Sequence, residues 1–215
     1  MSDTPEELRR RSGKSATEIR DAYDHDEAET TSRIKRRIAA RTRRHQFGDV
    51  DGRVLDVACG TGTNFRHFPE SAEVFGVDIS GDMLEVARDG ATELDGRVGL
   101  QQMDAQRLSL EAGSFDYVVS ALSTCTFPDP IEALNEMGRV CKPSGQVRLL
   151  EHHKWQFGPL GELQERSAEE EYRRVGCRLY DDPAKVVEQS DLDVVGRRRW
   201  RLPPFTGVVA RPPSP

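Results

Sequence analysis

The sequence predicts an α/β fold, built on a doubly wound and mostly parallel β-sheet. From about residue 53 onward, short apolar runs alternate with stretches of helical spacing, which is the pattern of successive strand–helix units. Closer to the C-terminal end, two strand-like runs at 192–195 and 206–210 follow one another closely. They predict an antiparallel hairpin that closes one edge of the sheet.

The N-terminal part of the chain differs from this pattern and predicts a helical extension. Residues 1–30 are polar and are expected to be loose. A helix is expected over 33–45, where Ile34 and Ile38 lie one turn apart among many arginines. A solvated helix face is the first interpretation of these arginines, and contact with an anionic membrane or RNA is the alternative. Tyr23 is a candidate to cover a ligand if this extension acts as a lid.

Five apolar runs predict the central strands. They lie at 54–58, 74–78, 98–103, 115–120 and 146–150. A helix begins near Met83, and another is expected over 130–140, where Pro130 suits the first turn. The turn-forming residues 142–145 are expected to end the second helix before the last of these strands.

The last third of the chain is less regular. Helices are expected over 163–174, which is rich in Glu and Arg, and over 182–189, which opens with Asp-Pro. The arginine-rich run 197–201 is expected to separate the two strands of the terminal hairpin.

Composition excludes several classes of protein. The formal net charge of −6 gives no global electrostatic reason to bind nucleic acid. The sequence has no stretch of about 18 apolar residues, so no membrane-spanning helix is predicted. No apolar run follows the first charged residues, so no secretory signal is predicted. The expected location is therefore the cytoplasm. Cys59, Cys125, Cys141 and Cys177 form no CxxC pair, so they predict reduced thiols and no metal site.

Glycines and polar residues follow the first predicted strand. Gly60 and Gly62 allow a sharp turn and the close approach of a ligand, and the N–H groups near Asn64 suit an anion. Phe65 stands where a dinucleotide-binding GxGxxG motif has its third glycine, so that motif is disfavoured. The turn still predicts a ligand site beyond the carboxyl ends of the strands.

Carboxylates end the next two predicted strands. Asp78 stands where an acidic residue would accept hydrogen bonds from ribose hydroxyls. Asp104 follows the third strand, where it could accept a hydrogen bond from an adenine amino group. With Asp56, we expect three carboxylates at three successive strand ends, which is hard to explain by turn or capping roles alone.

At this point the sequence resembles the class I S-adenosylmethionine-dependent methyltransferases. The matching segments are 54–62, 76–80, 103–105, 115–120 and 140–146, in the order and spacing of that family. The resemblance implies a Rossmann-like sheet of seven strands with an antiparallel last strand. It divides the chain into an N-terminal helical extension or lid, 1–50, and a methyltransferase domain, 51–215.

Within the family, the chain looks most like small-molecule methyltransferases of the ubiquinone-biosynthesis type, and like a subgroup that acts on alkyl thiols. The local likenesses are 60–65, 122–126 and 151–152. The resemblance implies an S-adenosylmethionine-dependent enzyme that methylates a small apolar acceptor such as a thiol or a quinone precursor. An RNA or protein methyltransferase using the basic 33–44 helix, and a non-catalytic cofactor-binding module, are the alternatives.

The resemblance also implies which residues form the site. The expected donor-binding residues are Asp56, Ala58, Gly60, Gly62, Asp78, Ile79, Asp104, Ala105 and Ser120. Asp56 and the two glycines would hold the methionine moiety, while Ser120 and Leu122 would border the sulfonium and the acceptor.

A general base is needed only if the acceptor arrives protonated. His152 or His153, oriented by Glu151, is the predicted base because a neutral imidazole titrates near pH 7. The alternative interpretation is that these residues are polar groups that cap a strand end. No metal is expected in the mechanism.

Overall fold

The computed structural model describes residues 14–23, 33–92, 97–155, 161, 164, 168–170, 172–173, 176–180, 182–200 and 204–213, with backbone alone at 22–23 and 33–39. Its strands are β1 (Arg53–Val57), β2 (Glu73–Asp78), β3 (Val98–Gln102), β4 (Phe115–Ala121), β5 (Cys141–His152), β6 (Asp193–Trp200) and β7 (Phe205–Arg211). Its helices are α2 (Ala16–Tyr23), α3 (Arg33–Phe47), α4 (Gly81–Thr92), α5 (Pro130–Val140) and α7 (Pro183–Val187), with a 3₁₀ turn, η1 (Phe65–His67).

The strands form one seven-stranded sheet in the order β3-β2-β1-β4-β5-β7-β6. Strands β1 to β5 pair in parallel, and β7 pairs antiparallel with both of its neighbours, β5 and β6. This confirms the predicted mostly parallel sheet with an antiparallel last strand. The carboxyl ends of β1 to β4 consequently meet at one edge, where the predicted ligand site lies.

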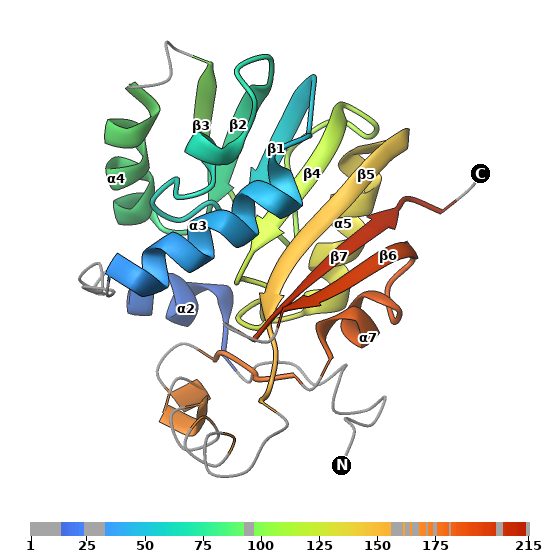
Figure 1. Ribbon diagram of the computed structural model, residues 1–215. Coiled ribbons are helices and arrows are strands. Elements are labelled where there is room, and N and C mark those ends of the chain that lie inside the picture. The colour runs from blue at the N-terminus through green and yellow to red at the C-terminus, as the bar shows by residue number, and fades with distance from the viewer. Residues whose placement is uncertain are drawn as a thin grey trace.

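Helices cover both faces of the sheet, as Figure 1 shows with α3 in front of the strands and α5 behind them. On one face, Phe47 of α3 and Leu84 of α4 join an apolar cluster with β1, β2 and β4. On the other face, Leu134 and Met137 of α5 and Val187 of α7 pack against the strands. These two clusters stabilise the sheet from both sides, which defines a doubly wound fold.

Local signals set the start of two of these helices. The Asp129 carboxylate accepts hydrogen bonds from the N–H groups of Ile131 and Glu132, and Pro130 occupies the first turn of α5. Asp182 caps α7 in the same way, accepting from the N–H of Ala184. Both Asp-Pro pairs therefore act as helix starts.

Three sequence-based expectations need correction. Residues 16–23 form α2 where a loose segment was expected, because Ile19 is buried. Residues 142–145 belong to β5, since the turn-like sequence is accommodated by an irregular register against β4. The run at 197–200 belongs to β6 rather than to a break between strands, because β6 is an edge strand on which exposed arginines are tolerated.

Two other expectations have a partial answer. In the predicted helix 163–174, residues 164, 168–170 and 172–173 are helical, and the others lie outside the described residues. The side chain of Tyr23 also lies outside them, and its covering role stays a prediction. Among the described residues, no helix has both the length and the apolar character needed to cross a membrane.

Candidate active site

A cavity of about 510 Å³ lies at the carboxyl ends of the parallel strands. Small-molecule sites have volumes of about 300–1,000 Å³, so this cavity can take a cofactor-sized ligand. The loops after β1 to β4 form most of its wall, and α2 and α3 contribute Ala16, Ile19 and Arg43. Of the predicted donor-binding residues, the lining includes Ala58, Gly60, Asp78, Ile79, Asp104 and Ala105.

The loop after β1 depends on its glycines. Gly60 has a φ of 55° and Gly62 a φ of 74°, a left-handed conformation that side chains other than glycine rarely adopt. At Gly62, an added Cβ would lie 2.5 Å from the Phe65 ring. At Gly60, a Cβ would meet nothing within 4 Å, so that glycine leaves its backbone open to the cavity.

Asp78 joins the ends of β1 and β2. Its carboxylate accepts hydrogen bonds from the Gly60 N–H at 2.8 Å and from the Ser80 N–H at 2.9 Å. The residue lines the cavity and is 9% exposed. The Asp78 carboxylate therefore both holds the glycine loop and lies in the wall of the cavity.

Asp56, in contrast, lies beneath the cavity rather than in its lining. It is fully buried, and the Asn64 side-chain amide donates to both of its carboxylate oxygens at 3.1 Å. The Arg43 Nε in turn donates to the Asn64 Oδ1 at 2.9 Å. Burial raises the pKa of Asp56 to about 7, while Asn64 and Arg43 favour its ionised form.

Asn64 and Arg43 are thus lining residues that the sequence analysis did not assign. In the sequence, Asn64 indicates only a helix N-terminus, and Arg43 is one of many arginines in a basic helix. No sequence signal separates Arg43 from Arg41 and Arg44, which are exposed. Arg43 reaches the cavity because of the way α3 is rotated against the sheet.

Ser120 and Gly62 are not part of the described cavity lining either. The Ser120 hydroxyl is fully buried and donates to the Val57 carbonyl at 2.6 Å, and it also bonds to the Ser123 hydroxyl. Ser120 therefore joins β1 to the loop after β4. The lining residues at this point include Leu122, Ser123, Thr126 and Phe127.

Comparisons with known proteins identify the family to which this chain belongs. Residues 54–145 match the family model described as a methyltransferase domain. The phosphatidylethanolamine N-methyltransferase of Cereibacter sphaeroides is 32% identical over 81% of this chain and 88% of that protein. The chain belongs to the class I S-adenosylmethionine-dependent methyltransferases.

Other relatives and a solved structure agree. The demethylmenaquinone methyltransferase of Staphylococcus aureus is 32% identical over 74% of this chain and 73% of its own length. The mitochondrial methyltransferase OMS1 of Saccharomyces cerevisiae is 29% identical over 74% of this chain, which spans only 38% of that protein. The PH0226 protein of Pyrococcus horikoshii has a TM-score of 0.65 and 27% identity, covering 85% of this chain and 92% of its own.

The cavity of this methyltransferase fits S-adenosylmethionine, its methyl donor. The donor carries ribose hydroxyls and an adenine amino group, and the cavity presents the acceptors Asp78 and Asp104 at adjacent strand ends. It also carries a positive sulfonium and an ammonium, and these suit a cavity with two carboxylates in its wall and a third beneath it.

The three residues predicted to supply a base are not in the lining of the cavity among the described residues. Glu151 is 2% exposed and accepts hydrogen bonds from the Ser123 and Thr124 N–H groups at 3.3 and 3.2 Å. Burial raises its pKa to about 7. Glu151 thus holds the loop that follows β4.

The two histidines point to other partners. His153 contacts the Thr206 hydroxyl through Nδ1 at 2.9 Å, and burial lowers its pKa to about 4. His152 Nε2 lies 3.6 Å from the Cys177 sulfur. The structure therefore does not bring this predicted trio together at the methyl donor cavity.

Proposed function

We propose that this methyltransferase methylates a small, mainly apolar molecule, such as a thiol or a quinone precursor. The observation that carries the proposal is the chemistry of the cavity lining. Its charged members in the described chain are Arg43, Asp78 and Asp104. The two carboxylates match the adenosyl part of the donor, which leaves a largely apolar wall for an acceptor.

Apolar side chains supply that remaining wall. Ile19 of α2 and Leu122 and Phe127 of the loop after β4 all line the cavity. Burial of such surface favours an apolar acceptor by about 25 cal/mol per Å² removed from water. One relative is named for demethylmenaquinone and another for phosphatidylethanolamine, both with large apolar parts, which supports the same class of acceptor.

The donor would be held mainly at the ends of β1 to β3. Asp78 would accept hydrogen bonds from the ribose hydroxyls, and Asp104 with Ala105 would hold the adenine. Gly60 would leave room for the methionine moiety, and Asp56 would act on it through Asn64 rather than by direct contact. Ile79, beside Asp78 in the lining, would pack against the adenosine.

Catalysis by this chain would rest mainly on alignment. The bound donor supplies a methyl group that its sulfonium already makes electrophilic. Holding two reactants in line can contribute on the order of 7–11 kcal/mol to lowering a barrier. The base role predicted for His152, His153 and Glu151 stays a prediction, and the contacts of Glu151 support a role in positioning Ser123 and Thr124.

A methyl-transfer assay with labelled donor tests the proposal. The acceptor panel contains an alkyl thiol, a demethylated quinone, phosphatidylethanolamine vesicles, bulk RNA and an unfolded protein. We expect label in a small apolar acceptor. Label confined to RNA or protein would overturn the proposed acceptor class while leaving the methyltransferase activity intact.

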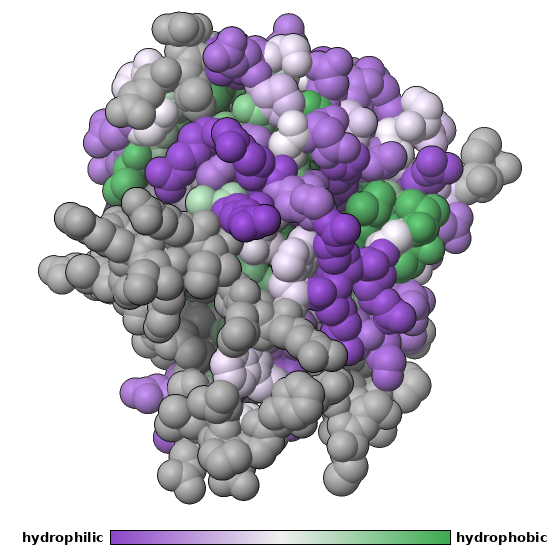
Figure 2. Space-filling view, viewed as in Figure 1, coloured by the Kyte–Doolittle hydropathy of each residue, from purple (hydrophilic) through white to green (hydrophobic). Residues whose placement is uncertain are grey.

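RNA as acceptor is the second candidate because of one observation. Arg41 and Arg44 are exposed on α3 beside Arg43, which reaches the cavity, and Figure 2 shows hydrophilic residues over the C-terminal part of this helix. A basic surface next to a methyl donor can attract a polyanion. A salt-dependent mobility shift with RNA, lost in an Arg41→Glu/Arg44→Glu variant, would favour this candidate.

A further inference from the structure

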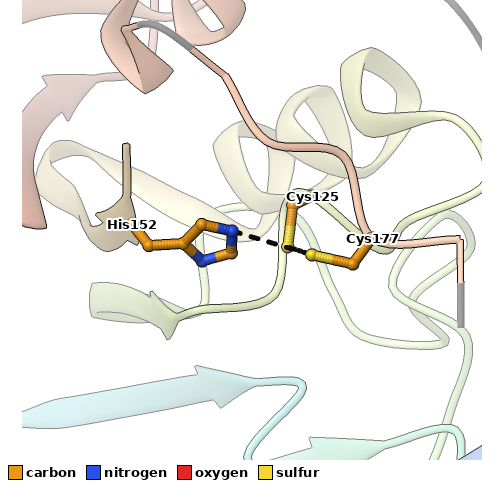
Figure 3. Close-up of side chains that lie close together, drawn as sticks. All are labelled: Cys125, His152 and Cys177. Carbon is orange, nitrogen blue, oxygen red and sulfur yellow. Dashed lines mark hydrogen bonds between the residues drawn. The ribbon is translucent and has the colours of Figure 1, made fainter. Parts of the chain in front are cut away.

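Cys125, His152 and Cys177 meet behind the wall of the donor cavity. Figure 3 shows their side chains directed toward one another from three separate segments. Cys125 lies in the loop after β4, His152 is the last residue of β5, and Cys177 precedes α7. Their ligand atoms, two sulfurs and one nitrogen, all lie within 4.8 Å of one another.

The distances are close to those of a metal-binding triad. The Cys177 sulfur lies 3.2 Å from the Cys125 sulfur and 3.6 Å from the His152 Nε2. Zinc binds thiolate at about 2.3 Å and imidazole at about 2.0–2.1 Å, so tetrahedral geometry separates two sulfurs by about 3.8 Å and a sulfur from a nitrogen by about 3.6 Å. A small movement of the two cysteines would complete the geometry.

We propose that Cys125, His152 and Cys177 bind a zinc ion. Two thiolates and an imidazole form a soft ligand set, which favours zinc over magnesium or calcium. On binding, each thiol would lose its proton to solvent and form a sulfur–zinc bond. The fourth position of the ion would remain open to water or to an added thiolate. This proposal departs from the sequence-based expectation that the cysteines form no metal site.

The surroundings suit a cation. Cys125 is 2% exposed and Cys177 is half-buried. Two thiolates this close would repel one another, and a divalent cation between them removes that cost. Arg178 is nearby, but its guanidinium donates to the backbone carbonyls of Cys125 and Phe127.

A zinc ion here would stabilise one wall of the donor cavity. The segment at 176–180 already holds the loop after β4, since the Arg178 N–H donates to the Cys125 carbonyl at 2.9 Å. The same loop supplies Leu122, Ser123, Thr126 and Phe127 to the cavity lining. Zinc ligands from both segments would tie them together, so metal and methyl donor should bind with positive coupling.

Titration of the reduced, metal-free protein tests the proposal. We expect one Zn²⁺ per chain, release of up to about two protons per ion, and a rise in melting temperature. With Co²⁺, we expect the visible and near-ultraviolet absorption of tetrahedral thiolate ligation. Cys177→Ser removes one of the two thiolates, so it should reduce the Co²⁺–thiolate absorption and weaken Zn²⁺ binding at least about tenfold.

The matched control is Cys141→Ala, which removes a buried cysteine of β5 outside the triad. It should keep the spectrum and the zinc affinity. Cys177 is half-buried, so its serine variant should fold, which the melting temperature of both metal-free proteins checks.

Two outcomes would overturn the proposal. One is zinc binding of equal strength in the parent chain and in Cys177→Ser. The other is a reduced parent chain that gives no thiolate spectrum with Co²⁺, for example because Cys125 and Cys177 serve only as a disulfide-forming pair. Neither result depends on the methylation assay.

Discussion

Asp56, Asn64 and Arg43 form a buried chain of polar contacts under the donor cavity. The Asn64 amide donates to the Asp56 carboxylate and accepts from Arg43, so each polar group has a partner. A buried carboxyl group is costly to ionise, and burial raises the pKa of Asp56 to about 7. At the scale of single residues, burial therefore favours the protonated form of Asp56 at pH values where an exposed aspartate is ionised.

The raised pKa of Asp56 predicts how the stability of the fold depends on pH. The pKa of Asp56 is about 7 in the folded chain and 3.8 as an ordinary carboxyl, so the folded state binds more protons between these values. Its contribution to the free energy of unfolding should therefore fall as pH rises from about 4 to about 7, by on the order of 4 kcal/mol at most. Chemical unfolding of the parent chain and of Asp56→Asn across this range measures the difference.

Comparing the two proteins cancels the other groups that titrate in the same range. These include His67, whose pKa burial lowers to about 4 and whose effect has the opposite sign. Asp51→Asn, at an exposed position, is the control and should follow the parent chain. An identical pH slope in Asp56→Asn and the parent would contradict the expectation.

At the scale of elements, α2 and the loop after β4 supply the part of the cavity wall that the other strand ends do not form. Ile19 of α2 is 5% exposed and lines the cavity with Leu122 and Phe127. We propose that α2 covers the bound donor as a lid, in line with the expected role of the N-terminal extension. Burial of an isoleucine side chain contributes about 1.5–3 kcal/mol, so this contact is a substantial part of what holds α2 against the cavity.

The lid proposal predicts the behaviour of Ile19→Ser. This variant should weaken binding of the methyl donor about tenfold or more, because α2 loses the apolar contact that holds it over the cavity. Calorimetric titration with the donor measures the effect. Thr17→Ala, at an exposed position of the same helix, should bind like the parent chain. Equal affinity in Ile19→Ser and Thr17→Ala would show that α2 is not a lid.

At the scale of the whole molecule, donor binding should stabilise the fold. A ligand at about 100 times its Kd adds about 2.7 kcal/mol to the free energy of unfolding, and a chain of this size gains about 2–4 °C per kcal/mol. The melting temperature should therefore rise on addition of S-adenosylmethionine. Thermal unfolding with and without the donor measures this rise.

Asp78→Ala should reduce that rise. Loss of a charged hydrogen-bond acceptor costs about 1.5–3 kcal/mol, which corresponds to about 10–100-fold weaker binding. The control is Glu73→Ala, an exposed carboxylate at the start of the same strand, β2. A donor-induced rise that is equal in both variants would exclude Asp78 from the donor site.

Much of the fold could be predicted from the sequence, because it depends on local patterns. The apolar runs that predicted the strands all lie within or overlap β1 to β7, and Pro130 marks the start of α5. The boundaries were less predictable where tertiary pairing overrides local preference. The turn-like residues 142–145 join β5 as an irregular stretch between Cys141 and Gln146, which both pair with β4. The arginines at 197–199 join β6 because β7 pairs with them.

For the candidate site, the sequence by itself determined the glycine loop and the carboxylates at the strand ends, because both follow from parallel strands that end together at one edge. Only the tertiary structure decided that Asp56 lies beneath Asn64, and that Arg43 rather than its neighbours reaches the cavity. It alone also brought Cys125, His152 and Cys177 together. These contacts join segments far apart in the chain, and the spacing of residues along the sequence does not predict which side chains will meet when those segments pack.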